Sequence, residues 1–320
     1  MAAMTRQQFL RTLSAGAASF AARCSQAEPL APQTLTFKTA GCEIRADIHG
    51  ASKGAAKPAL MWIHGGALIF GNRKGGITSP FHAGLLEQGY VIVSIDYRLA
   101  PETKLPAIIE DVRDAWNWIR AQAGRFSIDA GRIATGGGSA GGYLTQMTGF
   151  CLNSQPRALV SYFGYGDIVG PWYSQPDEFY RRQPLVSKEN AFAAVGTAPV
   201  SDPPQANRRD TFYLYCRQNG LWPMQVSGHD PHTEDKWFTP YCPIRNVTSK
   251  YPPTMLIHGT ADTDVPHSLS KDMDARLSTA GVAHEFITVD GAEHGLAGAK
   301  PEGVSRVAAR AVSFVKAHTA

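Results

Sequence analysis

The sequence predicts an α/β fold, in which a mostly parallel central sheet is flanked by helices. Two runs, residues 59–63 and 90–95, are almost wholly apolar, as expected for strands buried on both faces. Between Pro106 and Ala121, apolar residues recur every three or four positions, which predicts a helix with one apolar face. This alternation of buried strands and amphipathic helices is typical of a parallel sheet covered by helices.

The amino-terminal strands follow a different pattern. Residues 34–39 and 42–48 alternate apolar and polar side chains, which favours antiparallel strands at a half-solvated edge of the sheet. After Ala121 the strand and helix rhythm continues. We expect strands at 132–135, 158–163, 254–257 and 284–289, and helices near 139–150, 267–277 and 301–317.

The rhythm breaks at about residues 166–250, where aromatic residues, prolines and polar residues show no sustained period. We interpret this segment as a cap inserted over the sheet, within a single domain of residues 28–320. Its aromatic side chains are suited either to lining a substrate pocket or to forming the insertion's own core. They are Trp172, Tyr173, Trp222, Trp237 and Phe238.

Composition restricts the partners of the protein. Its 320 residues carry a formal net charge of only +4, with no basic run interleaved with aromatics, so nucleic acid is not expected as a partner. No apolar run approaches the ~20 residues that would cross a bilayer. His229 and His232 lie in a loop without a third ligand, so we predict no metal site, and no cofactor is expected. We expect a monomer or homodimer that binds a small molecule.

Residues 1–27 resemble an export signal. Arg6 and Arg11 precede an uncharged stretch of small residues at 13–22, although Gln7 replaces the second arginine of a twin-arginine leader. We therefore expect a periplasmic or secreted protein if this leader functions, and a cytoplasmic protein otherwise.

Five cysteines are present, and Cys24 would be removed with the leader. Four would remain, an even number that is compatible with disulfides. Cys216 and Cys242 both lie in the insertion, so this pair is the first to test.

The first chemical motif is Gly137-Gly138-Ser139-Ala140-Gly141, which lies between a predicted strand and a predicted helix. This is the context of the nucleophile motif G-x-S-x-G. Side chains two positions before and after the serine would collide with neighbouring backbone, while the serine hydroxyl is pushed clear of the sheet. Ser139 is therefore the candidate nucleophile.

The same loop allows a competing interpretation. Gly136, Gly138 and Gly141 also satisfy G-x-G-x-x-G, and Asp167 ends the next predicted strand, as in a dinucleotide site. The loop lies after two earlier strands of the sheet, however, and a nucleotide site would not require the aspartate and histidine found downstream.

A second motif, His64-Gly65-Gly66-Ala67, follows the apolar run 59–63. Loops of this type supply backbone N–H groups to the oxyanion of an acyl-transfer intermediate, together with the N–H of the residue after the nucleophile, here Ala140. The third glycine of the common H-G-G-G run is replaced by Ala67.

The candidate acid and base follow the last two predicted strands. Asp262 and Asp264 come after the strand at 254–257, and His294 comes after the strand at 284–289. The order Ser, Asp, His is the one this type of nucleophile motif requires, with histidine as base and aspartate orienting it. Spacing alone does not separate the two aspartates. His294 is favoured by its glycine-flanked loop over three other histidines: His258, His267 and His284.

Three separated motifs resemble the esterase and lipase branch of the α/β-hydrolases related to hormone-sensitive lipase. They are His64-Gly65-Gly66-Ala67, Asp96-Tyr97-Arg98-Leu99-Ala100-Pro101-Glu102 and Gly138-Ser139-Ala140-Gly141-Gly142. Asp262-Thr263-Asp264-Val265-Pro266 is instead similar to the D-x-x-V-P segment of prolyl-oligopeptidase-like hydrolases. The first aspartate of that segment belongs to the triad, so the resemblance favours Asp262.

The resemblance implies an α/β-hydrolase fold with a cap, and a serine carboxylic ester hydrolase acting through an acyl-enzyme on short acyl or acetyl esters. It also implies that Gly66 and Ala67 supply oxyanion amides, that Gly65 sets the turn, and that residues 96–102 are scaffold. Two alternatives stay open: a serine exopeptidase, because of the D-x-x-V-P segment, and a ligand-binding relative without catalysis.

Overall fold

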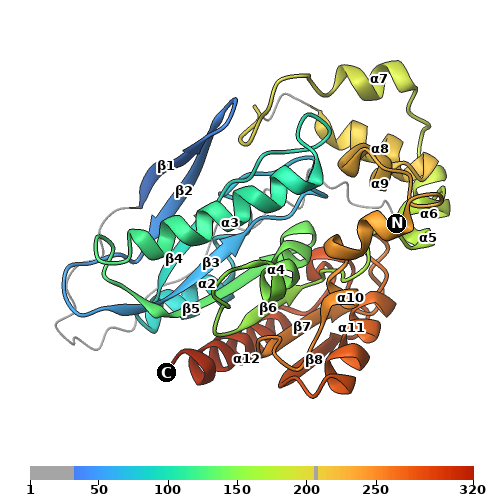
Figure 1. The fold of residues 1–320 in the computed structure, drawn as a ribbon. Helices are drawn as coiled ribbons and strands as arrows, with labels where there is room; N and C mark the ends of the chain where they lie inside the picture. The colour runs from blue at the N-terminus through green and yellow to red at the C-terminus, as the bar shows by residue number, and fades with distance from the viewer. Residues whose placement is uncertain (1–31, 205–207) are drawn as a thin grey trace.

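An eight-stranded sheet forms the centre of the protein in the computed structural model, which describes residues 32–204 and 208–320 (Figure 1). The strands lie in the order β1-β2-β4-β3-β5-β6-β7-β8. The first two are antiparallel to their neighbours, and all others pair in parallel. Their bounds are β1 Gln33–Thr39, β2 Glu43–His49, β3 Lys57–Ile63, β4 Val91–Ile95, β5 Ile128–Gly138, β6 Leu159–Tyr162, β7 Thr254–Gly259 and β8 His284–Val289. The predicted fold class is confirmed.

Helices cover both faces of the sheet. Figure 1 shows α3 and α4 on one face and α12 across the other, where α2 packs against α12. The apolar face predicted for α3 is buried, as shown by Ile108, Val112 and Trp116. The helix bounds are α2 Pro80–Glu87, α3 Leu105–Ala121, α4 Ala140–Cys151, α11 Ser268–Thr279 and α12 Pro301–Thr319.

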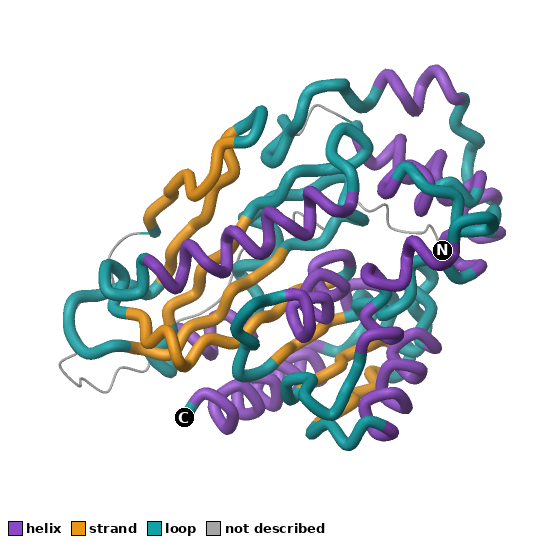
Figure 2. The backbone as a smooth tube through the Cα atoms, viewed as in Figure 1, coloured by secondary structure: helices purple, strands orange, loops and turns teal. Residues whose placement is uncertain are grey.

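The segment between β6 and β7 consists of short helices joined by loops. They gather beyond one end of the parallel strands (Figure 2). The elements are α5 Pro171–Ser174, α6 Glu178–Arg181, α7 Lys188–Ala193, α8 Arg209–Asn219, α9 Trp222–Ser227, the 3₁₀ helix η1 Asp235–Tyr241 and α10 Pro243–Asn246.

Most of the aromatic residues singled out in this segment form its core. The ring of Tyr173 stacks on Trp172 at 3.6 Å and on Trp222 at 4.2 Å between centroids, and both Tyr173 and Trp222 are buried. Phe238 is buried as well, whereas Trp237 stacks on His229. For Tyr173, Trp222 and Phe238 the structure therefore favours a packing role over pocket lining.

The cysteine pair named as the first to test is not joined by a disulfide. Cys216 and Cys242 are both free thiols, as are Cys42 and Cys151. Both thiols are buried, and that of Cys242 donates to Oδ1 of Asp167 at 3.8 Å. Burial raises the pKa of Cys242 to about 12, which keeps it protonated. The suggested leader at residues 1–27, with Cys24, lies outside the described residues. Within the described parts of the chain, no helix has the length and apolar character required to span a membrane.

Candidate active site

Ser139 lies in a sharp turn between β5 and α4, where its backbone adopts φ 57° and ψ −123°. Such a conformation is strained for a residue with a side chain and exposes the hydroxyl. The turn is tightly packed. A Cβ on Gly137 would lie 2.4 Å from the carbonyl oxygen of Gly141, and a Cβ on Gly141 would lie 2.0 Å from the carbonyl oxygen of Ile63. Both positions therefore require glycine.

The substitution Gly141→Ala should destabilise the fold by about 3 kcal/mol, because the added methyl collides with fixed backbone rather than with a movable side chain. Urea denaturation of the purified variant measures this free energy of unfolding. Gly303→Ala is the matched control, since Gly303 lies in α12 with open space around it and alanine favours a helix by about 1 kcal/mol. Equal stability of the two variants would contradict the proposed packing of the turn.

Ser139, His294 and Asp262 form one chain of hydrogen bonds. His294, in the 3₁₀ turn η2 (His294–Leu296) after β8, lies with Nε2 3.0 Å from Ser139 Oγ. Its Nδ1 is 2.8 Å from Oδ2 of Asp262, in the loop after β7. Because the carboxyl ends of parallel strands share one edge of the sheet, residues distant in sequence meet there.

The carboxylate of Asp262 is buried and fully hydrogen-bonded. Its Oδ1 accepts the N–H groups of Asp264 at 2.9 Å and Val265 at 2.8 Å, and its Oδ2 also lies 3.2 Å from Nε2 of His258. Burial alone would raise the pKa of Asp262, but the hydrogen bonds from His258, His294 and Val265 and the charge of His294 outweigh it. The pKa of Asp262 is held well below its usual range, so the carboxylate is ionised.

The other histidines weighed against His294 have different surroundings. His258 is buried behind Asp262, where its Nδ1 bonds Ser270 and its Nε2 faces the carbonyl oxygen of Val265. His267 stacks on Phe286, and His284 bonds Ser278.

The loop carrying Gly65, Gly66 and Ala67 lies against the nucleophile turn. A Cβ on Gly65 would lie 2.8 Å from the carbonyl oxygen of Gly138 and 3.2 Å from Cβ of Ser139, so only glycine allows this approach. Gly66 and Ala67 have φ angles of 113° and 54°. Within residues 32–204 and 208–320, the backbone N–H groups of Gly66 and Ala67 donate to no acceptor. Ala140 begins α4, where the first N–H groups of a helix have no partner within the helix.

Hydrogen bonds from the scaffold fix this loop. The hydroxyl of Tyr97 donates to the carbonyl oxygen of His64 at 3.0 Å, and the N–H of Ala100 donates to that of Leu68 at 2.8 Å. These contacts fit the scaffold role predicted for residues 96–102.

The insertion holds the same loop from the other side. Nε1 of Trp222 donates to the carbonyl oxygen of Ala67 at 2.8 Å. Arg209 donates to the carbonyl oxygens of Ile69 at 2.5 Å and Ala100 at 2.6 Å, and pairs with Glu102 through two hydrogen bonds of 2.7 and 2.6 Å. Sequence reasoning singled out Trp222 only as a pocket or core residue and missed Arg209, because their segment has no periodicity.

The chain matches the BD-FAE family over residues 46–277, which is more than half of its length. It belongs to the BD-FAE family of α/β-hydrolases. It is 28% identical over 255 residues to the esterase LipC of Mycobacterium tuberculosis, covering 74% of this chain and 55% of LipC. It is also 26% identical over 298 residues to the non-reducing polyketide synthase Preu6 of Preussia isomera, covering 82% of this chain but 13% of that protein.

A solved structure shows the same fold. The carboxylesterase EstE1, cloned from a metagenomic library, is 21% identical, with a TM-score of 0.65 over 91% of each chain. The likeness of Asp262–Pro266 in this BD-FAE protein to the prolyl-oligopeptidase segment stays a prediction.

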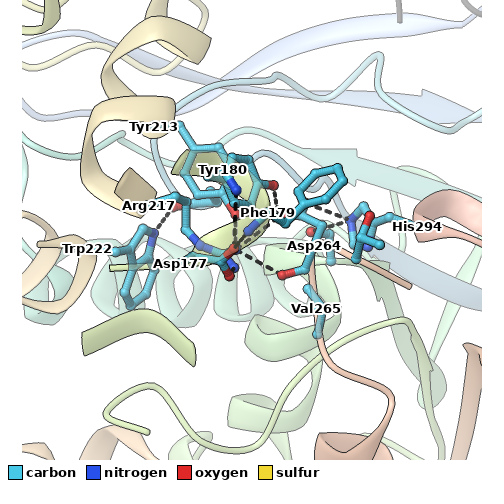
Figure 3. A network of polar contacts seen from close by, with 12 residues as sticks. Asp177, Phe179, Tyr180, Tyr213, Arg217, Trp222, Asp264, Val265 and His294 are labelled. Atoms are coloured by element: carbon cyan, nitrogen blue, oxygen red, sulfur yellow. Dashed lines mark hydrogen bonds and ion pairs between the residues drawn. The ribbon is translucent and has the colours of Figure 1, made fainter. Parts of the chain in front are cut away.

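The second aspartate of that segment occupies a different place from Asp262. Asp264 does not reach Nδ1 of His294; its Oδ2 lies 3.5 Å from Nε2 instead. Its Oδ1 is bonded by side chains from the insertion, shown in Figure 3, which sequence reasoning did not identify. They are Tyr180, Tyr213 and Arg217.

The residues weighed as metal or nucleotide ligands have other partners in this BD-FAE protein. Residues 32–204 and 208–320 contain no group of three or more His, Cys, Asp or Glu side chains that could hold a metal ion. His229 pairs with Glu234, and Nε2 of His232 faces the carbonyl oxygen of Ser174. Asp167, the acidic residue of the dinucleotide interpretation, accepts the N–H of Val169 in its own loop.

A small cavity of about 210 Å³ borders Gly295, the residue after His294, whereas neither Ser139 nor His294 itself lines it. Phe163, which lines it, packs edge-on against the ring of His294 with centroids 4.9 Å apart, and Gly295 lines it too. The remaining wall is mostly aromatic and aliphatic and includes Trp62, Tyr162 and Leu296.

Proposed function

We propose that this protein is a serine carboxylic ester hydrolase that acts through an acyl-enzyme formed on Ser139. The observation that carries the proposal is the hydrogen-bond chain from Ser139 through His294 to Asp262. It lies next to backbone N–H groups of Gly66 and Ala67 that donate to no acceptor among the residues the structure describes. Nucleophile, base and orienting acid have the separations this chemistry needs. The esterase names of LipC and EstE1 support the same activity.

In the proposed reaction, Nε2 of His294 accepts the proton of Ser139 as Oγ attacks the ester carbonyl carbon. Asp262 stabilises the protonated imidazole and keeps its Nδ1–H oriented. The carbonyl oxygen becomes negative and accepts hydrogen bonds from the N–H groups of Gly66, Ala67 and Ala140. One such donor typically contributes about 3 to 4 kcal/mol to the stabilisation of the transition state. His294 then protonates the leaving alcohol. Water repeats these steps on the acyl-enzyme and releases the acid.

We propose short acyl or acetyl esters as the substrate class. The resemblance to esterases implies this class, and the small apolar cavity that borders Gly295, the residue after His294, has a size that would suit a short acyl group. We further propose that residues 166–250 act as a cap, since Trp222 and Arg209 connect this segment directly to the loop of the proposed oxyanion donors.

Labelling with a fluorophosphonate, followed by mapping of the modified peptide, tests the proposal. We expect one adduct on Ser139, together with hydrolysis of chromogenic acetyl and butyryl esters. A folded protein that is unlabelled and hydrolyses no ester would contradict the proposal. Cleavage of peptide anilides without ester hydrolysis would instead favour the exopeptidase alternative.

A further inference from the structure

Asp264 is a buried carboxylate whose two oxygens have different surroundings. Oδ1 accepts the hydroxyl groups of Tyr180 and Tyr213, at 2.5 Å each, and Nη1 of Arg217 at 3.0 Å. All three donors come from α6 and α8 of the insertion, whereas Asp264 follows β7 of the sheet. Figure 3 shows this cluster beside His294.

The donors themselves are firmly held. The guanidinium of Arg217 is buried, lies 4.5 Å from the ring centroid of Tyr180, and donates through Nη2 to Asp177 at 2.6 Å. Asp177 in turn accepts the backbone N–H groups of Phe179 and Tyr180 at the start of α6. Because three fixed donors bind Oδ1, the position of Oδ2 is fixed as well.

Oδ2 of Asp264 lies 3.5 Å from Nε2 of His294, the nitrogen that faces Ser139. In the neutral imidazole this nitrogen presents its lone pair, which the carboxylate repels. In the protonated imidazole it presents an N–H, which the carboxylate attracts. We propose that Asp264 is a positioning residue for His294: a carboxylate, held by the insertion, that favours the protonated imidazole formed during catalysis. The inference rests on the proposed function.

The charges around His294 support this role. Asp262 faces Nδ1 and Asp264 faces Nε2, and the charge of Arg217 lies behind Asp264, balanced in part by Asp177. Phe163 after β6 packs an apolar ring on the imidazole, and the carboxylate of the adjacent Glu293 accepts hydrogen bonds from Thr263.

The pKa of Asp264 agrees with this arrangement. Burial would raise it, but the charges of His294 and Arg217 and the hydroxyl groups of Tyr180 and Tyr213 lower it below its usual value. An attraction between two groups acts on both, so ionised Asp264 favours protonated His294 to the same extent.

The acid limb of the pH profile of kcat/KM should therefore shift to lower pH by about one unit in Asp264→Asn. Without the negative charge, His294 loses its proton at lower pH and becomes active as a base there. Above that limb, activity should fall by up to about tenfold, because one pH unit corresponds to a tenfold change in the preference for the protonated imidazole. Asp177→Asn is the matched control. It removes a charge from the same cluster and retains the cap of α6, but Asp177 faces Arg217 rather than His294, so the limb should move by much less than in Asp264→Asn.

The imidazole of His294 is also followed directly by NMR titration, with assignment from His294→Gln. This measurement does not depend on turnover, so it tests Asp264 even if the wild type hydrolyses no ester. The titration midpoint should fall by about one pH unit in folded Asp264→Asn. An unchanged midpoint would overturn the proposal.

If Asp264→Asn does not fold, Tyr213→Phe replaces it, since this change keeps the ring and removes one donor from Oδ1. The negative charge of Asp264 is then less neutralised, and the midpoint of His294 should move to higher pH. A midpoint that stays in place or moves down overturns the proposal.

Discussion

Replacing Ser139 with alanine should lower kcat for ester hydrolysis by about 10⁶-fold and abolish labelling by fluorophosphonate. Oγ of Ser139 lies 3.0 Å from Nε2 of His294, so removing the hydroxyl takes away the nucleophile that the histidine activates. Steady-state kinetics with a chromogenic acetyl ester measure the loss.

The fold of this variant should be retained, because alanine keeps the backbone of the turn and its Cβ. Ser313→Ala, on the exposed side of α12, is purified in parallel and should keep full activity. Undiminished hydrolysis by pure Ser139→Ala would show that a different residue, or a different protein, carries the activity.

Replacing Asp262 with asparagine should lower kcat by about 10⁴-fold. The reason lies in the partners of the carboxylate. Oδ1 accepts two backbone N–H groups, from Asp264 and Val265, so the amide oxygen of asparagine should stay there. Its NH₂ group then faces Nδ1 of His294 and donates to it. This places the imidazole proton on Nε2, which can no longer accept the proton of Ser139.

Comparison with Asp264→Asn distinguishes the two aspartates. The structure predicts a loss of several orders of magnitude for Asp262→Asn and of up to about tenfold for Asp264→Asn. A larger loss of kcat in Asp264→Asn than in Asp262→Asn would show that Asp264, not Asp262, is the acid that orients His294. Both variants are compared at a pH well above the acid limb, with circular dichroism as the check that each is folded.

The sheet and its large helices were predictable because their burial produces regular patterns of apolar residues along the sequence. Strands such as β3 and β4 are covered on both faces and read as continuous apolar runs, and α3 shows its single buried face as a repeat of three and four residues. The glycine requirement at Gly137 and Gly141 was also predictable, since a sharp turn around a nucleophile leaves no room for side chains.

The insertion was not predictable in the same way. Helices of four to six residues, such as α5, α6 and α9, are too short to show a period and are stabilised by tertiary contacts. Spacing along the chain likewise did not separate Asp262 from Asp264. The direction of each side chain in the folded loop decides which one meets Nδ1 of His294. The sequence left open whether Cys216 and Cys242 are paired; both are free cysteines, because shared membership of one segment does not bring two thiols together.

The helix α8 connects to both halves of the candidate site. Arg209 at its start bonds the loop beside the proposed oxyanion donors, and Arg217 near its end bonds the carboxylate beside the histidine. An attempt to change substrate range by exchanging this segment for that of a relative would therefore remove both supports at once. A chimaera that keeps these two arginines and Trp222 should retain turnover, while one that drops them should fail on every substrate regardless of how well its new pocket fits.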